Sequence, residues 1–151
     1  MLPQIGSQLK SLNLDMTTHL GRHALGICDF PPLYNISLIV DSCLDMEELN
    51  IWGKLSEDAM SYLCENLTSK ILKLYFFWTG SLSDNNIRVL VKRCPKLTVL
   101  DIRSNEKVIY QGLVAIIEGL HFLEYLGVPD SIGNEQAWFA EHGSFGFARK
   151  H

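Results

Sequence analysis

The 151-residue sequence has no apolar run of the roughly 18 residues that a membrane-spanning helix needs, so we expect no such helix. Its first residues lack the basic and then apolar layout of a secretory signal. Basic residues are also few, because 13 Lys and Arg stand against 17 Asp and Glu, and a nucleic-acid-binding face would need a basic surface. We therefore expect a cytoplasmic or nuclear protein that binds neither membrane nor nucleic acid.

The sequence also lacks the motifs of common catalytic and metal sites. Its four cysteines form no Cys-x-x-Cys pair, which favours a reducing compartment over a disulfide framework. No glycine-rich phosphate loop joins a strand to a helix, and no spacing groups a nucleophile, a base and an orienting residue. His19 and His23 are four residues apart, with Cys28 beyond, but this loop-like segment lacks a fourth zinc ligand. We expect no catalytic residue, no metal and no cofactor.

What the sequence does contain is a phrase of spaced apolar residues, Leu-x-x-Leu-x-Leu, that returns five times with apolar replacements. Its central leucines lie 37, 25, 26 and 26 residues apart, at Leu12, Leu49, Leu74, Leu100 and Leu126. Such self-similarity is typical of stacked repeats, and this phrase is that of the leucine-rich repeat. Each unit is expected to be a strand and a helix that bury their apolar sides against neighbouring units.

A second pattern predicts helices in step with the strands. Apolar residues at positions i, i+3, i+4 and i+7 begin at Met60, Ile87 and Leu113. Ser56 and Ser83 precede two of these helices, where a hydroxyl can cap free backbone amides. Another helix is expected over residues 33–43, after a loop insertion that lengthens the first interval.

These patterns predict an α/β leucine-rich-repeat solenoid of about five repeats, with the form of a horseshoe arc. A parallel sheet would line its concave side and helices its convex side. Residues 1–130 form the predicted repeat domain, and residues 131–151 an irregular carboxyl-terminal cap or tail with a short helix near residues 136–141. Cys43 and Cys94 each lie six residues before a central leucine, and we expect them to pack as small apolar groups.

The concave face carries the candidate functional residues, because side chains between the leucine-type positions point away from the core. Strand stacking is expected to give one row of Asn13, Asn50, Tyr75, Asp101 and Gly127, and a second of Asp15, Trp52, Phe77, Arg103 and Pro129. The expected binding residues lie at the middle of this face: Glu48, Asn50, Trp52, Lys73, Tyr75, Phe77, Asp101 and Arg103.

Aromatic anchors ringed by charged residues are typical of protein-binding hot spots. The alternative interpretation is ordinary cross-strand packing, with Trp52 against Phe77 and with Asp101 or Arg103 in surface ion pairs. Trp78 lies further along the chain, and we expect it to pack in its loop.

Two segments are similar to one subtype of the repeat. The segment Cys-Pro-Lys-Leu-Thr-Val-Leu-Asp-Ile-Arg-Ser-Asn, from Cys94 to Asn105, resembles the cysteine-containing leucine-rich repeat, and the segment from Cys43 to Ile51 is similar to it. The helical phrases that begin at Leu55 and Leu82 also fit. Such repeats are typical of the F-box and leucine-rich-repeat protein family, and the resemblance covers roughly residues 9–129.

The resemblance implies that the repeats bind a protein substrate for an SCF-type cullin-RING ubiquitin ligase, in ubiquitin-dependent degradation. In that family an F-box docks onto the adaptor subunit of the ligase. No F-box-like segment is visible here, so we expect a fragment that meets the adaptor only if an F-box precedes it. Only the fourth phrase carries the subtype's asparagine, at Asn105; Thr17, Lys54, Thr79 and Ser131 replace it. The alternative is a stand-alone repeat scaffold, or an assembly or regulatory protein unrelated to ubiquitin.

Overall fold

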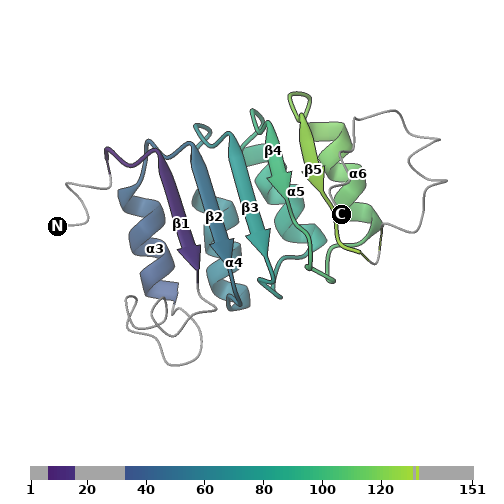
Figure 1. The fold of residues 1–151 in the computed structure, drawn as a ribbon, viewed down its shortest axis with the longest axis horizontal. Coiled ribbons are helices and arrows are strands. Elements are labelled where there is room, and N and C mark those ends of the chain that lie inside the picture. The colour runs from purple at the N-terminus through teal and green to yellow at the C-terminus, as the bar shows by residue number, and fades with distance from the viewer. Residues whose placement is uncertain (1–6, 16–32, 131, 133–151) are drawn as a thin grey trace.

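The computed structural model describes residues 7–15, 33–130 and 132, which form a five-stranded parallel sheet and four helices (Figure 1). The strands follow one another across the sheet in chain order: β1 (Ser11–Asp15), β2 (Glu48–Trp52), β3 (Lys73–Phe77), β4 (Val99–Asp101) and β5 (Tyr125–Gly127). The helices are α3 (Leu33–Ser42), α4 (Glu57–Asn66), α5 (Asp84–Arg93) and α6 (Tyr110–Gly119). All four lie behind the sheet in Figure 1, and we call the opposite side the front face.

The register of the sheet aligns the five repeated phrases. Leu12 pairs with Leu49, Leu49 with Leu74, Leu74 with Leu100, and Leu100 with Leu126. The predicted parallel sheet and its predicted rows are thus confirmed over the strands. The leucine-type side chains of β2 to β5 are buried toward the helices, while the residues between them point to the front face.

A doubled hydrogen bond joins each unit to the next. The carbonyl oxygen of Lys10 accepts from the backbone amides of Glu47 and Glu48, at 2.8 and 2.9 Å. The carbonyls of Glu47, Leu72 and Thr98 each accept a similar pair of amides from the residue before the next strand and from its first residue. A carbonyl oxygen has two lone pairs, and here both are used at the same place in four successive units. This repeated arrangement fixes the starting point of each strand.

Helices α4 and α5 begin directly after the serines that were predicted to cap them. The Ser56 hydroxyl caps α4 at 3.2 Å, and Ser83 forms a capping box at the start of α5. Helix α6 has no side-chain cap of its own. Its first free amide, that of Ile109, donates instead to Asp84 Oδ1 on α5 at 2.8 Å. The helix predicted over residues 33–43 is α3.

A single apolar core fills the space between sheet and helices, and Phe76 is among its largest fully buried side chains. Cys43 and Cys94 are buried in it, as predicted, and so is Cys64. Burial raises the pKa of the Cys94 thiol to about 12 and also raises that of Cys64. These thiols therefore stay protonated and serve as packing groups.

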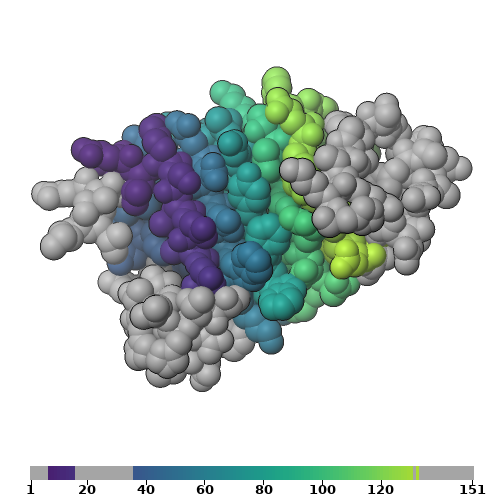
Figure 2. Space-filling model, in the orientation of Figure 1, coloured from purple at the N-terminus to yellow at the C-terminus, as the bar shows by residue number. Residues whose placement is uncertain are grey.

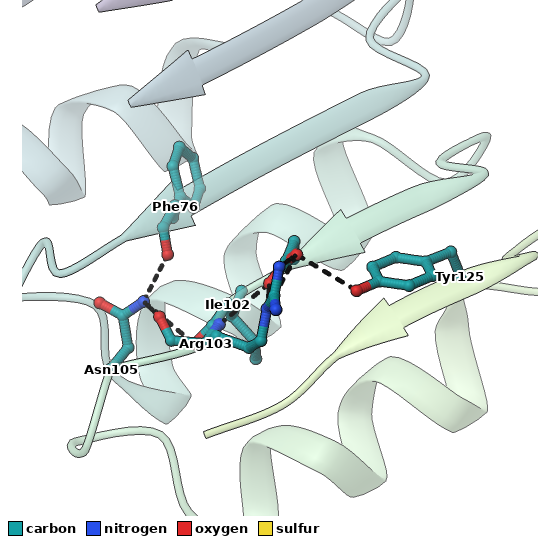
Figure 3. A network of polar contacts seen from close by, with 6 residues as sticks. Phe76, Ile102, Arg103, Asn105 and Tyr125 are labelled. Atoms are coloured by element: carbon teal, nitrogen blue, oxygen red, sulfur yellow. Dashed lines mark hydrogen bonds and ion pairs between the residues drawn. The ribbon is translucent and has the colours of Figure 1, made fainter. Parts of the chain in front are cut away.

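The asparagine of the fourth phrase joins two units at the carboxyl end of the sheet. The Asn105 amide nitrogen donates to the backbone carbonyls of Phe76 at 2.6 Å and Ile102 at 3.0 Å (Figure 3). Its carbonyl oxygen accepts from the Thr79 hydroxyl at 2.6 Å. Thr79 holds the corresponding place in the preceding phrase, so its hydroxyl joins this place in one unit to the same place in the next.

Some predictions fall outside the described part of the chain. They are the helix near residues 136–141, nearly all of the expected tail over 131–151, and the histidines and cysteine at His19, His23 and Cys28. Within the described part, no helix combines the length and the apolar character that crossing a membrane requires.

Candidate functional site

The front face brings the predicted site residues together in the expected rows. Asn13, Asn50, Tyr75, Asp101 and Gly127 are successive register partners across the sheet. Asp15, Trp52 and Phe77 form the second row, which Arg103 extends from just beyond the end of β4. Figure 2 shows this face in space-filling form, with side chains continuous from purple β1 to green β4.

Trp52, Tyr75 and Phe77 form what we call the aromatic cluster. The ring centroids of Trp52 and Phe77 are 5.4 Å apart and tilted by 42°, and those of Tyr75 and Phe77 are 6.5 Å apart. Both separations are typical of interacting aromatic pairs. The cross-strand packing of the alternative interpretation is therefore present, yet 46% of Trp52 remains exposed. The cluster is both packed from within and open to a partner.

Arg103 continues the aromatic cluster toward β4. Its guanidinium carbon lies 5.3 Å from the centroid of the Phe77 ring, within the range of a cation–π contact. Two of its nitrogens bind the Asp101 carboxylate, Nε at 3.0 and 3.1 Å and Nη2 at 2.8 Å (Figure 3). These hydrogen bonds hold the pKa of Arg103 above its ordinary value. The guanidinium is therefore fixed in place by two neighbours.

Asp101 differs from the prediction, which placed its charge on the surface. It is only 1% exposed and lies under Arg103, whose backbone amide also donates to it at 3.2 Å. The Tyr125 hydroxyl approaches its other oxygen at 3.4 Å. The physical reason for its burial is Gly127, the register partner of Asp101, because a side chain there would overlap the carboxylate. The ion pair of the alternative interpretation exists, but its acidic member is hidden.

The charges at the amino end of the front face are exposed on both sides. Lys73 and Glu48 lie 3.7 Å apart, with side-chain exposures of 47% and 37%. An exposed pair of this kind contributes little to stability and stays available to a partner. Between the two ends, the side-chain oxygen of Asn50 is buried without a hydrogen-bond partner in the part of the chain that the structure describes.

Trp78 is a surface residue, contrary to what was expected from the sequence. The prediction that it packs in its loop is wrong, because 61% of Trp78 is exposed. Its φ of 56° is the left-handed conformation that bulky residues rarely adopt. A signal was present in the sequence: β2 is followed by Gly53, whereas β3 is followed by Trp78 at the corresponding place.

A depression of about 300 Å³ lies at this end of the sheet. Its lining residues are Lys54, Leu55, Ser56, Glu57, Thr79, Gly80, Ser81 and Lys107. Lys107 and Glu57 pair across it at 2.7 Å. Over residues 7–15, 33–130 and 132, no three His, Cys, Asp or Glu side chains are placed to hold a metal ion.

No protein-family model matches the chain, and a search of curated proteins finds no relative of it.

Proposed function

We propose that the chain is a leucine-rich-repeat solenoid that binds another protein on its front face. The observation that carries this proposal is the aromatic cluster, where Trp52 is 46% exposed and Phe77 joins it to a fixed Arg103. Tryptophan, tyrosine and arginine are the side chains most enriched in binding hot spots. The front face would be the concave side of the solenoid.

The repeat assignment is supported by three regularities of the described residues. The strands share one register, the doubled carbonyl acceptors recur before each of four strands, and Asn105 bonds to Thr79, which holds the corresponding place one unit earlier. Units that contact only their neighbours through the same bonds are typical of solenoids.

We further propose that the bound protein is a substrate of an SCF-type cullin-RING ubiquitin ligase. This step follows from the resemblance of the repeats around Cys43 and Cys94 to those of F-box proteins. The chain itself would perform no chemistry; the aromatic cluster would anchor the substrate, and Glu48, Lys73 and Arg103 would orient it. Transfer of ubiquitin would belong to partner subunits.

The binding proposal is tested with the triple variant W52A/Y75A/F77A. Proteins retained by tagged wild-type chain are quantified by mass spectrometry against those retained by the triple variant. We expect one set of proteins to be lost from the triple variant, because its anchors are gone, while the circular dichroism spectrum is kept. The matched control is L44A/F122A, which removes two exposed apolar side chains elsewhere, of 55% and 64% exposure. Equal capture by all three proteins would contradict the proposal.

The ligase proposal is tested separately. We would sequence the 5′ end of the transcript in the source cells and probe the proteins retained by the wild-type chain for cullin-RING subunits. An in-frame F-box upstream, with the adaptor among the retained proteins, supports a ligase subunit. A transcript without an F-box, and retained proteins without ligase subunits, would favour the stand-alone scaffold.

A further inference from the structure

A left-handed backbone residue follows the second front-face row in three successive units. Gly53, Trp78 and Ser104 have φ angles of 120°, 56° and 60°. Trp52 and Phe77 are register partners, and Tyr75 pairs with Asp101, so these three residues occupy the same place in their units. The turn after each of these strands therefore requires a positive φ, which glycine adopts without strain.

A tryptophan at this place needs a reason that folding does not supply. Side chains with a Cβ are strained in this conformation, and bulky ones most of all. Burial does not offset the strain, since 61% of Trp78 lies in solvent. Strained residues of this kind cluster at binding sites, where the surrounding structure holds them in place. Trp78 also directly follows Phe77, the ring that contacts both Trp52 and Arg103.

Arg103, which lies over the ring of the neighbouring Phe77, exposes more of its charge than its paired carboxylate does, and exposed Asp130 is a second acidic group near it. Asp101 and Arg103 neutralise each other, but their side chains are 2% and 43% exposed. A partner therefore meets the cation and not the carboxylate beneath it. Because Asp101 occupies one edge of the guanidinium, the remaining N–H groups are held ready for a second acceptor. A carboxylate is the acceptor that matches this geometry and this charge.

From these observations we infer that Trp78 is an outer anchor of the binding surface, and that its partner is a protein segment with a carboxylate side chain beside a large apolar one. The apolar group would pack between Trp78 and the aromatic cluster, and the carboxylate would bind Arg103. The rest of the segment would run toward the depression, whose lining includes Thr79, the residue after Trp78. This inference rests on the proposed function and names the chemistry of its partner.

The test uses a phage-displayed library of random dodecapeptides, selected on the full chain. Affinities of the enriched peptides are then measured by fluorescence anisotropy for wild type, W78G, S104G, F122A and the triple variant W52A/Y75A/F77A. Glycine fits a left-handed position, so W78G keeps the backbone, and S104G makes the same change one unit later. Phe122 is as exposed as Trp78, at 64%. It precedes β5 and so lies at the amino end of the parallel strands, whereas Trp78 follows the carboxyl end of β3.

We expect the enriched peptides to carry Asp or Glu next to a large apolar residue. W78G should bind them about thirtyfold more weakly or worse, as for a hot-spot residue, while S104G and F122A bind unchanged. Replacing the peptide carboxylate by its amide should weaken binding about tenfold.

Each contrary result overturns a separate part. If W78G binds as wild type does while the triple variant does not, Trp78 is no anchor and the proposed function stands. Enriched peptides without acidic residues, or with equally good amide versions, overturn the carboxylate partner. If no peptide distinguishes wild type from the triple variant, both this inference and the proposed binding surface are overturned.

Discussion

At the scale of single residues, Gly127 shows how a missing side chain shapes the front face. It lies beside Asp101 in the register, where any Cβ would overlap the carboxylate. Asp101 in turn binds Arg103, whose guanidinium lies over the Phe77 ring. The space beside one glycine thus decides where the exposed cation of the surface lies.

Gly127→Ala is therefore expected to lower the free energy of unfolding by about 2–3 kcal/mol, because it displaces a buried carboxylate from its donors. Urea unfolding followed by circular dichroism measures the loss. The control is Gly80→Ala: Gly80 has a φ of 70° but open space around it, so only backbone strain of about 1 kcal/mol is expected. A loss at Gly127 no larger than at Gly80 would show that the carboxylate moves aside freely.

The buried thiols give the fold a dependence on alkaline pH. Burial raises the pKa of Cys94 to about 12, above the value of about 8.5 for an unfolded thiol. A group with a raised folded pKa contributes its full stability below the unfolded pKa and loses it as the pH climbs toward the folded value. We expect the free energy of unfolding to fall between pH 8.5 and 12.

This prediction is measured by urea unfolding across that pH range in a Cys28→Ser background. Adding Cys94→Ala should give a less stable chain whose stability falls less steeply with pH, because one buried thiol no longer titrates. Identical slopes with and without Cys94 would contradict the assignment. Below pH 9, Cys94 should react with a thiol reagent only after urea is added.

The sequence predicted which side chains are neighbours on the front face, but it could not predict how deeply each of them is buried. Alternation along strands correctly placed Trp52 against Phe77, because register and period determine which side chains meet. It could not show that Asp101 is buried, since that depends on a glycine in the next strand and an arginine two residues on. Nor could it place Trp78, because the period of a strand ends where the left-handed turn begins.

At the scale of whole elements, the helices differ in how their first turns are capped. Helices α4 and α5 use their own serines, but α6 depends on Asp84 of α5. Gly112 belongs to the same contact, since a Cβ there would overlap Asp84 Oδ1. The start of one helix is thus built from the start of the helix before it.

Asp84→Ala is expected to cost about 1–2 kcal/mol, because it removes a charged acceptor from the amino terminus of α6. Hydrogen exchange read by mass spectrometry should show faster exchange in peptides that cover residues 109–113. The control Ser56→Ala removes an ordinary cap and should cost about 1 kcal/mol, with its exchange effect confined to α4. If D84A instead loosened only the start of α5, the cap between helices would be refuted.

Local sequence signals explain which helix starts could be predicted. A serine followed by acidic residues marked the starts of α4 and α5 because such caps act within a few residues. The start of α6 offered only its apolar period, since the acceptor lies 25 residues away on another helix. A contact between residues that far apart does not show in a pattern that repeats every three or four residues along one helix.

At the scale of the whole molecule, burial grows from the first strand toward the middle of the sheet. Leu12 in β1 is partly exposed, whereas Leu74 in β3 is fully buried. Both are central leucines at the same place in their phrases, so only their position along the stack differs. In the described part of the chain, strand β1 has a neighbouring strand on one side only, whereas β3 has one on each side, so Leu12 has fewer side chains to pack against.

Leu74→Ala is therefore expected to cost about 3–4 kcal/mol, and Leu12→Ala about 1–2 kcal/mol. Urea unfolding of both variants, with amide exchange of β1 and β3 as a second readout, measures the difference. Exchange in β1 should be faster than in β3 in the wild-type chain. Equal costs at the two leucines would mean that the stack unfolds without weaker ends.

Because the doubled carbonyl acceptors fix the register of each strand, the positions of the front-face side chains do not depend on the number of residues that connect two strands. Strands β1 and β2 are separated by a longer interval than the other strands, yet Leu12 meets Leu49 as Leu49 meets Leu74. Insertions between strands can thus accumulate without changing which side chains are neighbours on the front face. The outward-facing residues of one strand can therefore be exchanged, by evolution or by design, while the neighbouring strands keep their register and their own outward-facing residues.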